Sequence, residues 1–397
     1  MSIEIKKNVY WVGKIDWDLR RFHGEELSTN NGSTYNSYLI KDEKNVLIDT
    51  VYTPFAEEFI ENLQKLIPLE EIDYIVINHA EPDHSGALPY LMAKIPNAKI
   101  FCSPNGVKSI KGYYHKDWDI TPMKTGDRLN IGSKELIFIE NQFVHWPDSA
   151  MCYLTEDKIL FSQDAFGQHY ANKGMFNSSC DPCVLQFELL KYYANIVAPY
   201  SKRVIKKIQE LKTLNLDIDV ICPSHGVMWD ENPQQVVDLY AQWCDSYAED
   251  QVCIVYDTMY QSTRKMAEAI ASGYSKVAPK TVVKLFNAGT ADKSDIITEI
   301  FRSKLIVAGS PTVNNGISTS MAGLLDELIA FAMTGKKATA FGSYGWNPVG
   351  LKIINSKLKD AGFEVIADGL LTNWNPDEEA LEACQDYGKK LAESMKL

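Results

Sequence analysis

The chain has 397 residues, of which 45% are hydrophobic and 23% are charged. This composition is that of a folded globular protein and excludes a disordered or fibrous chain. Forty basic against 52 acidic residues give a net charge of −12, which argues against non-specific binding to nucleic acid or to an anionic membrane.

The sequence also argues against a membrane protein and against a cysteine-ligated metal site. No apolar run approaches the roughly 20 residues that a membrane-spanning helix needs. The N-terminus carries charges where a signal peptide needs an apolar stretch, so we expect a cytoplasmic protein. Of eight cysteines, only Cys180 and Cys183 form a C-x-x-C pair. Because a thiolate metal site usually needs a second pair, we expect reduced thiols, with a redox-active Cys180–Cys183 pair as the alternative.

The N-terminal half combines short strands, hairpins and helices. A helix with proline in its first turn is predicted at residues 54–66, and a buried strand at residues 74–77. Other apolar runs predict strands at residues 9–12, 38–40, 46–49, 99–102, 136–140, 151–154 and 159–162. This mixture indicates two sheets between helices.

Residues that can bind a metal follow the strand at residues 74–77. His79, Glu81, Asp83 and His84 form the pattern H-x-E-x-D-H, with four potential ligands within six residues. In an extended segment alternate side chains share one side, so His79, Glu81 and Asp83 would point one way and His84 another. One short loop could therefore serve two neighbouring metal ions.

Three further candidate ligands lie in or just after apolar strands, namely His145, Asp164 and His225. A single histidine on an apolar segment is more often a core residue than a ligand, so each is weak evidence alone. The chain has seven histidines, and four of them occur at strand ends in this half. Taken together, these residues predict a metal centre.

The C-terminal half alternates apolar runs with amphipathic stretches. We place its start at residue 250, after a helix predicted at residues 234–248. Strands are predicted at residues 252–256, 282–286, 305–309, 338–341 and 365–367, and helices at residues 263–277, 292–302, 321–333, 349–361 and 377–395. Five strands that alternate with five helices predict a doubly wound parallel sheet. Such a sheet binds ligands at the carboxyl ends of its strands.

Three loops at these strand ends carry hydroxyl, amide and aromatic side chains. The first loop leads into a helix N-terminus, which favours a phosphate, although serine and threonine also cap helices without a ligand. No G-x-G-x-x-G motif is present, which disfavours a dinucleotide. The candidate binding residues are Thr258, Met259, Tyr260, Gln261, Ser262, Thr263, Pro311, Thr312, Val313, Asn314, Asn315, Gly316, Ser343, Tyr344, Gly345 and Trp346.

These motifs resemble those of flavodiiron proteins. H-x-E-x-D-H, followed by His145, Asp164 and His225, is similar to the metal motif of the metallo-β-lactamase fold in its flavodiiron version, and the second half is similar to a flavodoxin with FMN. The resemblance covers essentially the whole chain. It implies an α/β protein with a metallo-β-lactamase-like αββα sandwich at residues 1–249 and a flavodoxin-like FMN domain at residues 250–397. We expect no further domain, which is the minimal two-module form.

The resemblance also implies which residues hold two iron ions. One iron would be held by His79, Glu81 and His145, and the other by Asp83, His84 and His225, with Asp164 as the bridge. In some family members the residue equivalent to His84 turns away. Zinc hydrolases of this fold have a histidine in place of Glu81, and a carboxylate shifts the preference from zinc toward iron. His23, Trp146 and Tyr193 would line the pocket over the irons, or are ordinary packing and surface residues.

The implied activity is that of an oxidoreductase. An external donor (rubredoxin, a reduced deazaflavin or a nicotinamide-linked reductase) passes electrons through FMN to a non-haem di-iron site, which reduces dioxygen to water or nitric oxide to nitrous oxide. The resemblance further implies a head-to-tail homodimer or a dimer of dimers. The sequence does not rank the two gases. Two alternatives stay open: a hydrolase of the same fold with an attached flavodoxin, which Glu81 disfavours, and a non-enzymatic electron carrier or gas sensor.

Overall fold

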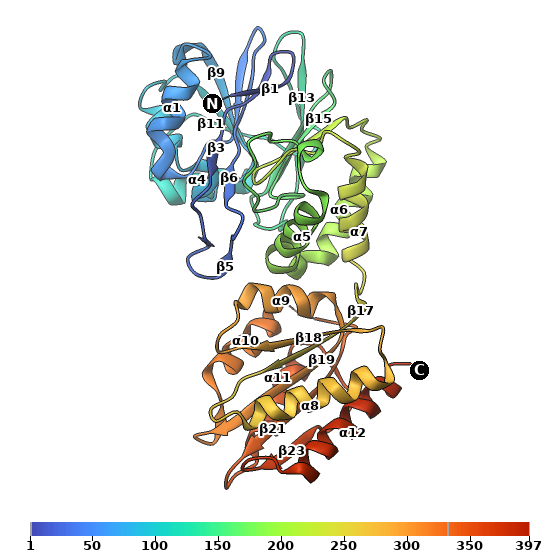
Figure 1. Cartoon of the computed structure of the whole chain (residues 1–397). Helices are drawn as coiled ribbons and strands as arrows, with labels where there is room; N and C mark the ends of the chain where they lie inside the picture. The colour runs from blue at the N-terminus through green and yellow to red at the C-terminus, as the bar shows by residue number, and fades with distance from the viewer. Residues whose placement is uncertain (1, 332, 397) are drawn as a thin grey trace. The chain divides into compact units, whose positions relative to one another are not determined.

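The computed structural model describes residues 2–331 and 333–396 (Figure 1). Its internal contacts divide the chain into two compact units. The first unit comprises Met1–Phe22 and Thr29–Cys244, and the second comprises His23–Ser28 and Asp245–Leu397. The boundary expected after residue 249 falls at the first residue of strand β17 (Glu249–Tyr256), in the second unit.

Two sheets form the centre of the first unit. Within the described residues, one sheet has seven strands in the order β1-β2-β7-β8-β9-β10-β11, and the other has five in the order β12-β13-β14-β15-β16. The seven are β1 (Ile3–Lys6), β2 (Val9–Trp11), β7 (Tyr38–Ile40), β8 (Asn45–Ile48), β9 (Ile72–Ile77), β10 (Lys99–Cys102) and β11 (Ile120–Pro122). The five are β12 (Arg128–Asn130), β13 (Glu135–Glu140), β14 (Ala150–Leu154), β15 (Ile159–Gln163) and β16 (Val220–Pro223). The short strands β3 (Lys14–Asp16), β4 (Arg21–Phe22), β5 (Leu27–Ser28) and β6 (Ser33–Tyr35) lie outside both sheets.

An apolar core fills the space between these two sheets. Trp11 and Ile48 of the first sheet cluster with Phe138 and Phe161 of the second, and all four are buried. Because alternate residues of a strand point to opposite faces, the outer face of each sheet is left for helices. Burial of this apolar surface is the main favourable term in the folding of the unit.

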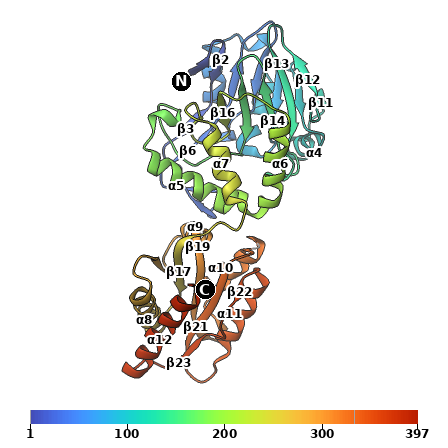
Figure 2. The same cartoon turned by 90° about the vertical axis from the view of Figure 1, so that its right-hand side faces the viewer.

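Helices cover the outer faces of the two sheets (Figures 1 and 2). Those beside the first sheet are α1 (Ala56–Gln64), α3 (Leu88–Met92) and α4 (Pro104–Tyr114), and those beside the second are α5 (Pro182–Tyr192), α6 (Ser201–Thr213) and α7 (Gln234–Trp243). The single-turn helix α2 (Pro82–Ser85) follows the end of β9. Helix α4 begins after Ser103, whose side chain accepts the backbone N–H of Gly106. The helix predicted to run to residue 248 is wrong at its end, because α7 stops at Trp243 and Ser246 has a φ of 46°.

The second unit is built on a parallel sheet. Among the described residues its main strand order is β18-β17-β19-β21-β22, the doubly wound order in which the connections reverse direction between β17 and β19. The strands besides β17 are β18 (Val282–Asn287), β19 (Ser303–Val313), β20 (Gly316–Ile317), β21 (Lys337–Tyr344), β22 (Glu364–Val365) and β23 (Leu370–Asn373). The last strand, predicted at residues 365–367, is wrong in extent. The chain forms the two short strands β22 and β23 instead, because Gly369 turns the backbone between them with a φ of 104°.

Helices cover both faces of this sheet. Helices α8 (Ser262–Val277) and α12 (Glu378–Ser394) lie side by side on one face (Figure 1), where Ile270 and Leu391 join the core. Helices α9 (Lys293–Arg302), α10 (Thr319–Phe331) and α11 (Val349–Asp360) pack on the other face. The predicted αββα sandwich and flavodoxin-like sheet are thus confirmed. None of the described helices is long and apolar enough to cross a membrane.

Candidate metal and flavin sites

The H-x-E-x-D-H loop joins β9 to the single-turn helix α2. His79 and Glu81 lie in the loop, and Pro82 opens the helical turn that carries Asp83 and His84. The expected extended segment is therefore wrong beyond Glu81, because proline presets the backbone for the first turn of a helix. The turn places Asp83 and His84 together in a group with His225, whereas His79 and Glu81 form a group with His145.

The remaining candidate ligands come from the second sheet. His145 follows β13, Asp164 follows β15 directly, and His225 follows β16. Strands β15 and β16 are parallel neighbours, so Asp164 and His225 leave the sheet at the same edge. The fold brings all seven predicted metal ligands into overlapping groups.

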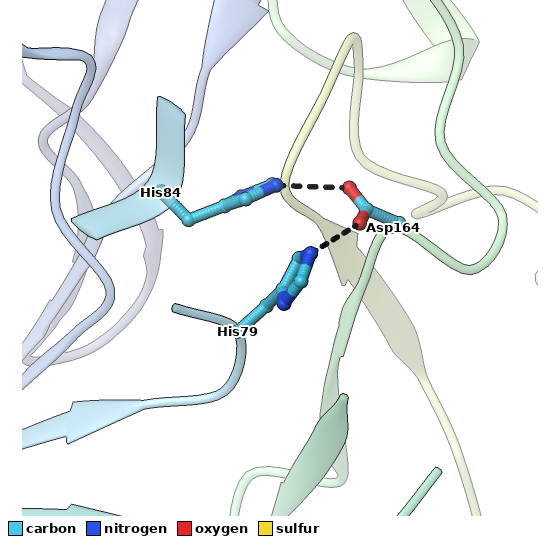
Figure 3. Close-up of side chains that lie close together, drawn as sticks. All are labelled: His79, His84 and Asp164. Carbon is cyan, nitrogen blue, oxygen red and sulfur yellow. Dashed lines mark ion pairs between the residues drawn. The ribbon is translucent and has the colours of Figure 1, made fainter. Parts of the chain in front are cut away.

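Asp164 faces histidines of both of the other groups. Its Oδ2 lies 3.4 Å from His145 Nε2 and 3.7 Å from His79 Nε2. Its Oδ1 lies 3.2 Å from His84 Nε2 and 3.5 Å from His225 Nε2. Figure 3 shows His84 directed at one carboxylate oxygen and His79 at the other. One side chain can therefore reach two metal positions.

A further carboxylate completes each group. In the first triad (His79, Glu81 and His145), Glu81 Oε2 lies 3.2 Å from His79 Nε2 and 3.6 Å from His145 Nε2. In the second triad (Asp83, His84 and His225), Asp83 Oδ2 lies 3.0 Å from His225 Nε2 and 3.4 Å from His84 Nε2. The ligand atoms within each triad all lie within 4.8 Å of one another.

The chemistry of this cluster fits two iron ions. Asp83 Oδ1 and Asp164 Oδ1 are buried without a hydrogen-bond partner among the described residues. Burial would raise the pKa of Asp164, but the histidines around it, with His84 foremost, hold that pKa well below its usual range. Burial would lower the pKa of His84, but Asp164 and Asp83 raise it to about 9. Buried carboxylates among imidazoles, with no thiolate, form a donor set that suits iron.

A cavity of about 530 Å³ lies at the carboxyl ends of β17, β19 and β21 in the second unit. All three predicted loops contribute to its lining, together with Asn347 and with Trp374 and Asn375 after β23. Trp346 and Trp374 are 86% and 63% exposed, and their ring centroids lie 6.3 Å apart. Indole rings presented in this way can pack against a flat aromatic ligand.

The loop before α8 fits a phosphate. Thr258 Oγ1 is buried and has no hydrogen-bond partner in the part of the chain that the structure describes. The loop ends at the N-terminus of α8, where unpaired backbone N–H groups and the helix dipole favour an anion. Thr263 Oγ1 lies 2.8 Å from Ser343 Oγ and so joins the first loop to the third. A cavity with a phosphate end and an aromatic end fits FMN.

Comparison with known proteins supports both assignments. A family model described as ODP family beta lactamase matches residues 34–226, and a flavodoxin model matches residues 254–388. The chain is 49% identical to the anaerobic nitric oxide reductase flavorubredoxin of Escherichia coli O1:K1 / APEC, over 99% of this chain and 82% of that protein.

Two solved structures resemble the whole chain. Rubredoxin oxygen:oxidoreductase from the anaerobe Desulfovibrio gigas is 34% identical with a TM-score of 0.96, and the alignment covers 100% of this chain and 99% of that one. The flavodiiron protein from Giardia intestinalis is 33% identical with a TM-score of 0.94, over 99% of this chain and 96% of that one. The chain belongs to the flavodiiron protein family.

Trp146 and His23, two of the residues predicted to line the pocket of this flavodiiron protein, have surroundings that differ from each other. The Trp146 ring packs against the first triad, with its centroid 5.2 Å from that of His79. His23 is exposed in the turn between β4 and β5, and its backbone contacts assign it to the second unit. The pocket role of each stays a prediction.

The third predicted pocket residue, Tyr193, is fully buried. Its hydroxyl lies 2.8 Å from Ser201 Oγ, and its ring packs edge-on against Tyr240. The preceding residue, Tyr192, has its ring centroid 6.2 Å from that of His225. Sequence reasoning did not select Tyr192, because two adjacent tyrosines carry no signal that separates them until the turn of α5 is known.

Two of the metal-site histidines in this flavodiiron protein are held through Nδ1 by hydrogen-bond partners that the sequence analysis did not identify. His79 Nδ1 lies 3.2 Å from Asp148 Oδ2, and His225 Nδ1 lies 2.7 Å from the carbonyl oxygen of Thr34. Such partners fix which nitrogen carries the proton and leave Nε2 for a metal. The one available hint was that Asp148 follows His145 in the same loop.

The flavin cavity also differs in part from the predicted set. Gln261, Thr263 and Gly316 are not among its lining residues, whereas Asn347, Trp374 and Asn375 are. Thr263 faces Ser343 instead. Trp374 and Asn375 were not predicted because they follow β23, a strand that the sequence pattern did not reveal.

Proposed function

We propose that this flavodiiron protein reduces nitric oxide to nitrous oxide and dioxygen to water. The observation that carries the proposal is the pair of triads around Asp164, in which each carboxylate oxygen faces two histidines. Two metal positions that share one bridging ligand can act together on a diatomic gas. Both reactions consume electrons, so the protein is an oxidoreductase.

In this proposal His79, Glu81 and His145 would hold one iron, Asp83, His84 and His225 would hold the other, and Asp164 would contribute a ligand to each. The irons, when bound, supply the redox chemistry of gas reduction. The carboxylates offset the positive charge of the metal ions. Because these carboxylates are buried, few water molecules screen their attraction to the metal ions. Trp146 covers the first triad and limits the access of water to it.

FMN is proposed to occupy the cavity of the second unit, with its phosphate at the loop from Thr258 to Thr263 and its ring near Trp346. When bound, FMN exchanges one or two electrons, which suits a donor that delivers them singly. The loops from Pro311 to Gly316 and from Ser343 to Trp346 contribute backbone and side-chain groups at the ring.

Relatives support both gases. The 49% identical relative is named a nitric oxide reductase, and the 34% identical structure is named a rubredoxin oxygen:oxidoreductase. The higher identity places nitric oxide first. We propose rubredoxin as the external donor, with a reduced deazaflavin or a nicotinamide-linked reductase as the alternatives. A head-to-tail homodimer, alone or as a dimer of dimers, would bring the FMN of one subunit near the irons of its partner.

The test uses anaerobically prepared protein loaded with iron and FMN, and one artificial low-potential donor. Consumption of each gas is measured side by side. Two molecules of nitric oxide, two electrons and two protons should give nitrous oxide and water. Dioxygen should take four electrons and four protons to give two molecules of water.

The Asp164→Asn variant serves as the control for the shared carboxylate. An amide is a weaker metal ligand, so we expect activity on both gases to fall by about 100-fold. If the loaded native protein consumes neither gas, or binds two zinc ions and hydrolyses esters, the proposal is wrong.

A further inference from the structure

Asp148 is a buried carboxylate next to the first triad, and the function proposed above assigns it no role. Its Oδ2 lies 3.2 Å from His79 Nδ1 and accepts a hydrogen bond from the backbone N–H of Ala80 at 2.9 Å. The side chain has no exposed surface. Because His79 directs Nε2 toward Glu81 and Asp164, Nδ1 is the nitrogen that donates to Asp148.

In the second triad His225 has a different kind of outer partner, whereas the buried carboxyl group of Asp49 interacts electrostatically with both His84 and His79. His225 Nδ1 lies 2.7 Å from the carbonyl oxygen of Thr34, which is a neutral acceptor. His79 therefore faces a full negative charge where His225 faces a dipole. A carboxylate draws the Nδ1 proton more strongly than a carbonyl does, and so it increases the electron density that the imidazole donates through Nε2.

Two hydrogen bonds from other residues anchor the backbone of the loop that carries Asp148. The Ser103 hydroxyl, just after β10, donates to the carbonyl oxygen of Asp148 at 2.7 Å. The Asn105 side chain donates to the carbonyl oxygen of Pro147 at 3.0 Å. The same loop carries His145, so one loop supplies a ligand of the first triad and also the partner that orients another ligand of that triad.

We propose that Asp148 is a positioning residue that makes the two metal positions unequal. It holds His79 with Nε2 toward the metal and increases the electron density of that ring. The oxidised state of an iron in the first triad is therefore stabilised more than that of an iron in the second. The inference rests on the proposed di-iron function. It predicts that the two irons are reduced in two separate steps, with the second triad reduced first.

The test compares native protein with Asp148→Asn, both loaded with iron and FMN and kept without gas. Asparagine has the same shape and still offers an oxygen to His79, but it carries no charge. We expect two irons per chain in both proteins. Followed by electron paramagnetic resonance and Mössbauer spectroscopy, the later reduction step of the variant should move to higher potential while the earlier iron step and the FMN steps stay unchanged.

Two further variants separate positioning from packing. Asp148→Ala removes the acceptor, so we expect iron in the first triad to bind about 10- to 100-fold more weakly and the iron content to fall from two to one per chain. Ser103→Ala loosens the same loop but keeps the carboxylate. It should lower the melting temperature and leave the iron reduction steps as in the native protein.

The inference is overturned if Asp148→Asn leaves both iron steps unchanged, or if it moves them by equal amounts. It is also overturned if Ser103→Ala shifts the later step as much as Asp148→Asn does, since loop packing would then explain the effect. None of these readouts needs gas turnover. A protein that binds and reduces two irons but consumes no gas would therefore contradict the proposed activity and still test the role of Asp148.

Discussion

At the scale of single residues, we expect the identity of residue 81 to influence which metal the first triad prefers. Glu81 Oε2 lies within 3.6 Å of the Nε2 atoms of both His79 and His145. A carboxylate is a hard oxygen donor, whereas an imidazole at this position would give a nitrogen-rich set that suits zinc. Glu81 therefore shifts the preference of the first triad from a hydrolytic metal toward a redox metal.

Replacing this carboxylate should change the metal content. For Glu81→His we expect the ratio of bound iron to bound zinc to fall by about tenfold, which corresponds to about 1.4 kcal/mol, and gas reduction to fall with it. Elemental analysis of protein produced with both metals present measures the ratio. Glu61→His, at an exposed position of α1, controls for the added imidazole. An unchanged ratio in Glu81→His would contradict the argument.

The residue scale also shows what the sequence can and cannot predict about the site. His79, Glu81, Asp83 and His84 were predictable because metal chemistry restricts both residue type and spacing within one loop. Asp148 was not, because its role depends on a contact across 69 residues that no local pattern encodes.

At the scale of elements, the C-terminal end of α9 is held by a buried lysine. Lys336 Nζ donates to the carbonyl oxygens of Phe301 and Tyr247, each at 2.6 Å, and of Ser303 at 3.0 Å. A cation is favoured where a helix leaves its last carbonyl groups unpaired. Burial nevertheless lowers the pKa of Lys336 to about 8, although Glu249 opposes this shift.

This pKa predicts how stability depends on pH. In the unfolded chain the ordinary lysine pKa of 10.5 applies, so between pH 8 and pH 10.5 the unfolded state binds more protons than the folded state. The contribution of Lys336 to the free energy of unfolding should therefore rise with pH across this window, by about 3 kcal/mol. Denaturant titrations give the free energies of unfolding of the native protein and of Lys336→Met, and the difference between these values measures the contribution of Lys336. Lys337→Met is the neighbouring control, and a difference that stays flat or falls would refute the prediction.

Elements themselves were predictable where the periodic pattern is long. Helices such as α8 and α12 repeat their apolar positions over several turns, and the strands between them are continuous apolar runs. Strand β23 escaped prediction because it has four residues and pairs with the carboxyl half of β21, whereas β22 pairs with the other half. A four-residue strand that pairs with only half of its partner leaves no regular pattern in the sequence.

At the scale of the whole molecule, the second unit includes a segment from far earlier in the chain. Ser28 donates its backbone N–H to Ser294 Oγ at 3.1 Å and its hydroxyl to Asp292 Oδ1 at 2.9 Å. Asp292 also caps α9 by accepting from the backbone N–H groups of Ser294 and Asp295. No sequence pattern could assign His23–Ser28 to this unit, because the contact spans 266 residues.

A pair of variants tests whether this segment is held in place. Asp377→Ala removes only the cap of α12 and should lower the free energy of unfolding by about 1 kcal/mol. Asp292→Ala removes a cap and the partner of Ser28, so we expect a loss of about 2 kcal/mol. Unfolding of the FMN-loaded protein, followed by flavin fluorescence, measures both. Equal losses would mean that Ser28 contributes nothing.

The order of the metal ligands along the chain has a consequence for biosynthesis. His225 is the last of the seven, and it precedes Asp245, where the main part of the second unit begins. The ribosome therefore completes the set of ligands before it has made the sheet that binds the flavin, and N-terminal domains generally fold first during synthesis. We therefore expect iron to be able to enter a nascent chain whose flavin half does not yet exist, and a shortage of flavin in the cell to leave a protein that carries its metals and lacks its electron entry point.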